Sequence, residues 1–228
     1  MILKTGAEFA TAVIDLATGL ILLALTAAGL YGKDWREKKL GKSWLCVLIM
    51  LSFGNILGFA AHAFRWTETV FDVIWIFIYP FMYGVAVSFA VHALIYVTKG
   101  RLPGAGLKTA MYLSAAILCI VSTVTGFFTV GDIRIFVVYA ALIDLPSLVA
   151  VCACGIKRRW KSGYFVLLAL VPQLVGFPFQ LLRKGSVRLI VELDHNGIYH
   201  LCLLVSVILF FFAARADIKT SFEETSVN

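Results

Sequence analysis

The sequence predicts an all-α membrane protein, a bundle of seven transmembrane helices that forms a single domain over residues 1–228. Two observations on composition indicate this class: 61% of the residues are hydrophobic and only 14% are charged. Ordinary soluble domains are about half apolar and about a quarter charged. The third observation is length, because seven spans of about 20 residues need about 140 positions, close to the total number of hydrophobic residues. No length remains for a soluble enzyme domain.

Seven long apolar runs define the expected spans, at residues 8–31, 43–64, 69–97, 107–129, 132–154, 161–182 and 196–216. The first run could be mistaken for a cleaved signal peptide. It contains Glu8 and Asp15, however, and it exceeds the usual secretory apolar core of about 7–15 residues. A strongly basic loop also follows it. We therefore expect a retained helix.

Turn and charge signals separate the later runs. Lys99-Gly100-Arg101 starts the break after the third run, and Lys157-Arg158-Arg159 ends the fifth. Gly131-Asp132 is the shortest break and predicts a tight hairpin between the fourth and fifth runs. Pro172 predicts a kink in the sixth run.

The distribution of positive charge orients the predicted bundle. The loops after the first, third and fifth runs, together with the tail after residue 214, hold fourteen Lys and Arg residues, and the opposite side holds six. Because cytoplasmic loops carry an excess of Lys and Arg, we expect the N-terminus outside and the C-terminus in the cytoplasm. The net charge of +7 reflects this bias, so we expect no nucleic-acid partner. From Asp217 onward we expect a short, polar, mobile tail.

Ionisable side chains inside the spans point to function, because each costs a few kcal/mol in a membrane. In the predicted orientation, His62 ends the second span, Asp72 begins the third, and His200 lies in the second turn of the seventh, with His195 at the rim. Asp15 lies about 10 Å into the first span, counting about 1.5 Å per residue. These side chains form one layer near the outer face. An alternative is that the histidines only cap helix ends at the membrane interface.

The chemistry that fits this layer is a zinc site. Imidazole is a common zinc ligand, and catalytic sites have three protein ligands and a water. We expect His62, His195 and His200 to bind the metal, and Asp72 to take the proton of a zinc-bound water. Ligating histidines need partners for their other N–H group, and neighbouring polar residues are candidates for this second layer: Asp15, Asn196 and Tyr199.

The order of these residues resembles the alkaline ceramidase and progestin/adiponectin-receptor superfamily. That family has a Ser-x-x-x-His motif in the second helix, an aspartate that opens the third, and a His-x-x-x-His motif that opens the seventh. This chain has Gly58-Phe59-Ala60-Ala61-His62, then Asp72, and later His195 and His200. The resemblance covers the whole chain as architecture but only about five positions as motif. It implies a multi-pass, zinc-dependent hydrolase of a lipid-like amide or ester, as in ceramides, with membrane lipids as partners.

Two departures from the family pattern bear on the metal. Gly58 replaces the serine and removes its hydroxyl. His195 and His200 are five residues apart, so on one helix they differ by about 140° in azimuth and do not share a face. Either His195 lies in a non-helical turn, which Gly197 permits, and reaches the metal, or the site has only two good ligands and is a polar binding site.

A second function class stays open at this point. A seven-helix transporter or ligand sensor needs polar groups along the bundle axis rather than in one layer. His92, Asp144 and Gln173 are the candidates for such a path. More simply, these three side chains form hydrogen bonds within the bundle.

Overall fold

The computed structural model describes residues 2–4, 6–100, 140–182, 184–188 and 192–219, and the single positions 113, 116, 120 and 124. Apart from those single positions, the fourth predicted span, 107–129, lies outside the described residues. The first part of the fifth span and the predicted hairpin at Gly131-Asp132 also lie outside them. What is described is mostly helical, as the composition predicts.

Five described helices are long and apolar enough to cross a membrane. They are α1 (Ala7–Tyr31), α3 (Lys39–Ala63), α4 (Glu68–Val97), α8 (Lys161–Leu182) and α9 (His195–Lys219). Each agrees with a predicted span to within four residues at either end. The prediction of long, apolar helices is therefore confirmed in these parts of the chain, and by length and composition these helices could cross a membrane.

Shorter elements lie between the long helices. A short helix, α2 (Lys33–Glu37), precedes α3, and a π-helical turn, η1 (Ala140–Asp144), leads into α7 (Leu145–Lys157). Pro146 stands in the first turn of α7. Because proline has no backbone N–H to donate to the preceding turn, the regular α-helical bonding pattern is broken there.

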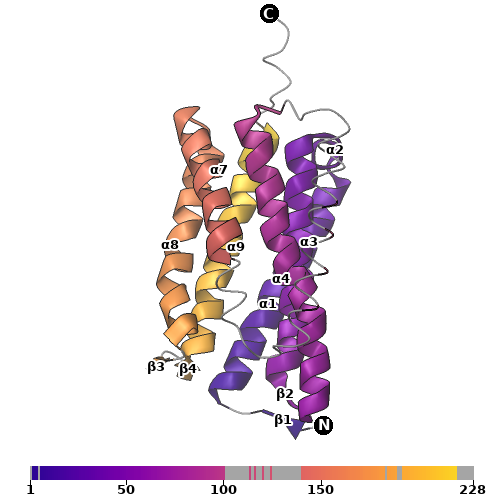
Figure 1. Ribbon diagram of the computed structural model, residues 1–228, viewed down its shortest axis with the longest axis vertical. Coiled ribbons are helices and arrows are strands. Elements are labelled where there is room, and N and C mark those ends of the chain that lie inside the picture. Colours follow the sequence, from indigo (N-terminus) through magenta and orange to yellow (C-terminus); the bar gives the residue numbers. More distant parts are fainter. Residues whose placement is uncertain are drawn as a thin grey trace, which may run out of the picture.

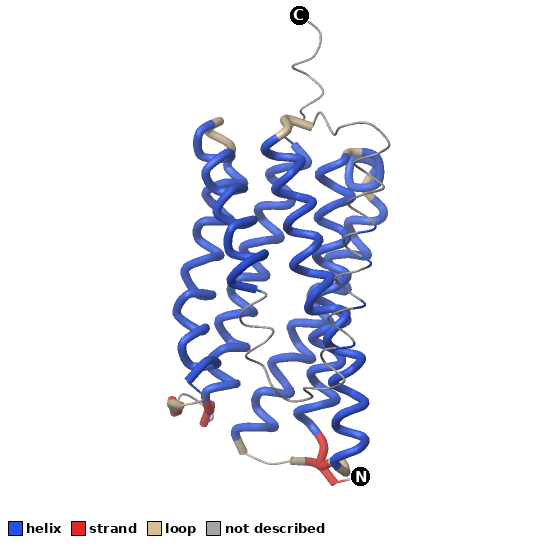
Figure 2. The backbone as a smooth tube through the Cα atoms, viewed as in Figure 1, coloured by secondary structure: helices blue, strands red, loops and turns tan. Residues whose placement is uncertain are grey.

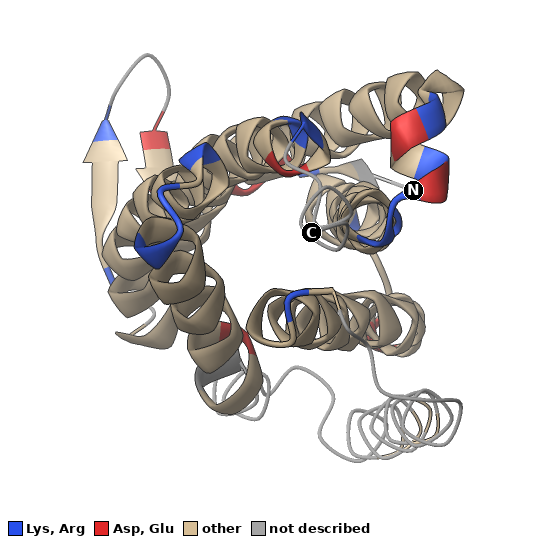
Figure 3. Cartoon of the chain, turned by 90° about the horizontal axis from the view of Figure 1, so that it is seen from above, with Lys and Arg blue, Asp and Glu red and all other residues tan. Residues whose placement is uncertain are grey.

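The long helices run side by side along the long axis of the molecule (Figures 1 and 2). The most extensive contacts join α1 to α3, α3 to α4 and α8 to α9, and α1 also contacts α9. Seen along the bundle, most of the helical ribbon is neither Lys or Arg nor Asp or Glu (Figure 3). Such a composition is typical of helices that face lipid.

Two short strand pairs close one end of the bundle. β1 (Ile2–Leu3) pairs antiparallel with β2 (Phe64–Arg65), and β3 (Ser186–Arg188) pairs with β4 (Glu192–Asp194). The backbone N–H of Lys4 also donates to the carbonyl of Ala63, at 2.9 Å. The N-terminal segment is thereby held against the end of α3.

The prediction of a mobile tail from Asp217 onward is wrong for residues 217–219. The last helix, α9, continues to Lys219, and Asp217 is fully buried in it. The indole N–H of Trp44 donates to Asp217 Oδ2 at 2.7 Å, and the Tyr96 hydroxyl donates to Oδ1. Asp217 is therefore a core residue that joins α9 to α3 and α4, because two neighbouring helices supply the donors that its carboxylate needs.

Candidate metal centre

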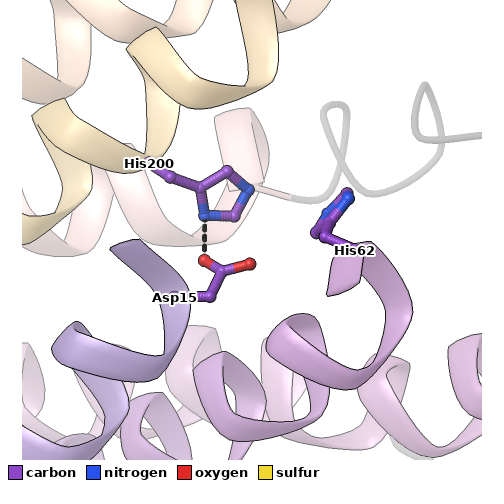
Figure 4. A group of neighbouring side chains, drawn as sticks. All are labelled: Asp15, His62 and His200. Carbon is purple, nitrogen blue, oxygen red and sulfur yellow. Dashed lines mark ion pairs between the residues drawn. The ribbon is translucent and has the colours of Figure 1, made fainter. Parts of the chain in front are cut away.

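Three helices bring Asp15, His62 and His200 together at one place in the bundle (Figure 4). We refer to these residues as the Asp-His-His cluster. Asp15 comes from α1, His62 from the last turn of α3 and His200 from the second turn of α9. One carboxylate oxygen and two ring nitrogens lie within 4.8 Å of one another. The sequence places these side chains in one layer, and the structure brings them into one cluster.

The Asp15 carboxylate is fully buried, and within the described part of the chain neither of its oxygens has a hydrogen-bond partner. Its Oδ1 lies 2.5 Å from Nδ1 of His200, which Figure 4 marks as an ion pair. The same nitrogen has no hydrogen bond, so the two atoms are close without the alignment that an N–H donor requires. A buried carboxylate without donors is strongly unfavourable unless a proton or a cation accompanies it.

Gly58 makes the room that the Asp15 carboxylate occupies. A Cβ atom at Gly58 would lie 2.9 Å from Asp15 Oδ2 and 3.3 Å from Cγ. Such distances are shorter than van der Waals contact. The position at which the resembling family has a serine thus carries no side chain here, and the carboxylate from α1 fills that space instead.

The donor set suits a transition metal. Two imidazoles and one carboxylate form the ligand set of many catalytic zinc sites, which leave a fourth position open. Ligand atoms around a tetrahedral zinc are about 3.4 Å apart, given bonds of about 2.1 Å. A pair of ligand atoms at the 4.8 Å limit would therefore have to approach by about 1.4 Å on binding, whereas Asp15 Oδ1 and His200 Nδ1, now 2.5 Å apart, would have to separate by about 0.9 Å. His62 also packs edge-to-face against Trp75 and against His200, with ring centroids 6.4 Å and 5.6 Å apart.

His195 lies outside the Asp-His-His cluster. It is the first residue of α9, and the carboxylate of Asp194 caps this helix by accepting the backbone N–H of Gly197 at 2.8 Å. The cap starts a regular helix at His195, so the structure does not have the non-helical turn that would bring His195 to the metal. Asp15, which the sequence suggests only as a supporting residue, is instead the third possible ligand beside His62 and His200.

One cavity is lined by some of the other residues of the predicted outer layer but not by all of them. The cavity has a volume of about 590 Å³, and its lining includes the whole Asp-His-His cluster. His195, Asn196 and Tyr199 also line it, and the Tyr199 ring packs against His200 at 5.3 Å. Asp72 lies in the second turn of α4; it is not a member of the Asp-His-His cluster and is not among the described lining residues.

The cavity is elongated and mostly apolar. Along α9 its lining extends from His195 to Phe210, a rise of about 22 Å at about 1.5 Å per residue. Asp144 and Gln173, two residues of the predicted transport path, line this same cavity. The transport-path residues are therefore not a separate set, because two of them share a cavity with the candidate metal centre.

His92, the third residue of that path, lies in a different, fully buried cluster. Its Nδ1 lies 2.6 Å from the hydroxyl of Ser43, and its Nε2 lies 3.2 Å from Asp217 Oδ2. The Ser43 hydroxyl donates to the carbonyl of Leu40 at 2.9 Å, so it accepts from the His92 ring. Neither His92 nor Asp217 is among the described cavity-lining residues. This inner cluster joins three helices.

Sequence reasoning missed Asp217 as a member of the inner cluster. A signal was present, since Phe210, Ala213, Ala214 and Asp217 follow the i, i+3, i+4, i+7 spacing of one helix face. All four residues are buried. The helical period therefore continues through Asp217, although hydropathy falls there.

Comparison with known proteins gives one result. The profile of a family described as "Family of unknown function (DUF6962)" matches residues 10–219. No curated protein and no solved structure matches the chain.

Proposed function

Since the chain belongs to this family of unknown function, we propose its activity from the geometry of the site: an integral membrane, zinc-dependent hydrolase of a lipid-like amide or ester. The match covers nearly the whole chain, but the family description names no reaction. The proposal includes seven spans, with the N-terminus outside, so that the Asp-His-His cluster lies near the extracytoplasmic face.

One observation carries the proposal. The Asp15 carboxylate is fully buried beside two imidazoles, and within the described residues nothing donates a hydrogen bond to it. In an apolar bundle this arrangement is stable only if a cation, or a proton on His200 or on Asp15 itself, balances the charge of the carboxylate. A divalent metal supplies that charge and uses the ring nitrogens at the same time.

The residues of the chain have distinct roles in this proposal. His62, His200 and Asp15 hold the metal, and Gly58 lets the carboxylate approach. A bound zinc would lower the pKa of its water to about 7, which provides a nucleophile at neutral pH. The apolar walls bind the chains of the substrate and exclude other water. His195, Asn196 and Tyr199 line the cavity and contact the polar part of the substrate in this proposal.

Metal content tests the proposal directly. Mass spectrometry of the detergent-purified chain should find about one zinc per chain in the wild type, and none in Asp15→Ala, His62→Ala or His200→Ala. His195→Ala should keep its zinc, because His195 is outside the cluster. Circular dichroism shows whether each variant is folded. A folded wild type that binds no metal, even after zinc is added, refutes the proposal.

A transporter or ligand sensor is the second candidate. The observation that favours it is the presence of Asp144 and Gln173 in the cavity wall, away from the inner cluster of His92. Alanine substitution separates the two functions. Loss of function at the Asp-His-His cluster without loss at Gln173 favours the hydrolase, whereas an equal loss at Gln173 favours transport.

A further inference from the structure

The cavity wall contains polar atoms that the candidate metal centre does not use. Within the described residues, Oδ1 of Asp144, Oε1 of Gln180 and Nε1 of Trp75 are buried without a hydrogen-bond partner. All three residues line the cavity. Buried polar groups are nearly always paired in folded proteins, so an unpaired group in a cavity wall indicates a missing ligand or water.

The charges of the wall are unbalanced. Four described lining residues are Lys, Asp or Glu: Lys4, Glu8, Asp15 and Asp144. Lys4 Nζ lies 3.5 Å from Glu8 Oε2, so these two form an ion pair. Asp15 belongs to the Asp-His-His cluster. Among the described residues, Asp144 is therefore the one carboxylate in the wall without a counter-charge.

The lining of the cavity that Asp144 shares favours a cation. Aromatic rings line the cavity, among them Trp75, Tyr79, Phe177 and Tyr199. The faces of such rings attract cations, and the attraction is stronger where water is excluded. Asp144 itself ends the π-helical turn η1, a kind of irregularity that is frequent at functional sites.

We propose that the cavity binds an amphiphile that carries a protonated amine, and that Asp144 binds this amine while the apolar wall holds the hydrocarbon chain. The inference deepens the proposed function, on whose cavity it rests, because it names the class of ligand. Gln180 Oε1 is a further unpaired acceptor in the wall of the same cavity. A neutral or anionic headgroup would leave the Asp144 carboxylate without a counter-charge.

Chain length suggests a simple probe. With carbon–carbon bonds of about 1.5 Å, an extended alkyl chain advances about 1.25 Å per carbon, so twelve carbons span about 15 Å. This length fits within the extent of the cavity along α9, which is about 22 Å. Dodecylamine and dodecanol then form a matched pair, because they share the chain and differ in the charge of the headgroup.

The test is a titration of metal-free, full-length protein in phosphatidylcholine nanodiscs with each probe, measured by calorimetry with empty nanodiscs as the blank. Wild type should bind dodecylamine about tenfold more tightly than dodecanol, because charge-assisted hydrogen bonds are stronger than neutral ones. Asp144→Asn, which keeps the shape, should bind the two probes within about twofold of each other, whereas Asp144→Glu should keep the preference.

Three outcomes overturn the inference: no preference for the amine in the wild type, no binding of either probe, or a preference that survives in Asp144→Asn. The wild-type comparison needs no variant, so it stands even if Asp144→Asn does not fold. Zinc content, measured on the same protein before the metal is removed, is read separately. Protein that binds zinc without preferring the amine contradicts only this inference, and protein that prefers the amine without binding zinc contradicts only the hydrolase.

Discussion

Replacing Gly58 by alanine should weaken metal binding more than any other change of one carbon atom in the cavity wall. The new Cβ would lie 2.9 Å from Asp15 Oδ2, whereas ordinary contact begins at about 3.4 Å. The carboxylate must therefore move by about 0.5 Å, and metal–ligand distances tolerate only about 0.2 Å. We expect zinc affinity to fall by about 10- to 100-fold, as is typical when the support of a ligand is disturbed.

Gly54→Ala is the matched control for this prediction. Gly54 lies one helical turn before Gly58 on α3 and also lines the cavity, but its Cβ would meet only Phe81 Cβ, at an ordinary 3.6 Å. Either substitution should stabilise α3 itself by about 1 kcal/mol, because alanine is the better helix former. A loss confined to Gly58→Ala therefore reports on Asp15 and not on the helix.

The assay is zinc competition against a chromophoric chelator in detergent, with wild type, Gly54→Ala and Gly58→Ala at the same pH. Gly54→Ala should match the wild type. If Gly58→Ala also binds zinc with wild-type affinity, then Asp15 is not a ligand, and the reasoning from the Gly58 contact is refuted. Circular dichroism of all three proteins shows whether the comparison is between folded states.

Three further predictions concern the bundle itself. Asp217→Ala should lower the thermal unfolding midpoint in detergent sharply, because losing one partner of a buried pair costs about 3–5 kcal/mol; an unchanged midpoint contradicts the role of the inner cluster. Gly163→Val should also lower the midpoint, since a Cβ there would lie 2.7 Å from the backbone nitrogen of Ile156, and normal unfolding of this variant would show that α7 and α8 do not meet so closely. A cysteine that replaces exposed Lys184 should react with a membrane-impermeant maleimide in intact cells, whereas one at exposed Lys99 should react only after permeabilisation; the reverse pattern contradicts the proposed orientation.

The helices were the most predictable part of the fold. A span depends on a continuous run of apolar residues and on the polar breaks beside it, which are local properties of the chain. The predicted run 161–182 coincides with α8, and 69–97 differs from α4 by one residue. The end of α9 was harder to predict, because Asp217 is polar and yet buried. Its partners Trp44 and Tyr96 lie on other helices, and hydropathy along one helix contains no information about them.

The sequence predicted how deep in the bundle the candidate site residues lie, but it did not predict which of them form the cluster. Depth follows from the position of a residue along its span, so His62 and His200 could be assigned to one layer together with Asp72. Membership depends on the azimuth of each helix, which is set by packing against its neighbours. The structure brings Asp15 into the cluster and places Asp72 outside the described cavity lining.

The sequence by itself determined the helical, apolar class of the chain, the approximate extents of the long helices and the level at which their ionisable groups lie, because each of these follows from composition and from the rise per residue. Tertiary structure decided which of those groups meet. Gly58 shows the physical reason: in the sequence it is the loss of a hydroxyl, and only the approach of α1 to α3 turns that loss into space for the Asp15 carboxylate. Contacts between helices depend on their rotation and separation, and many residues of each interface determine these together.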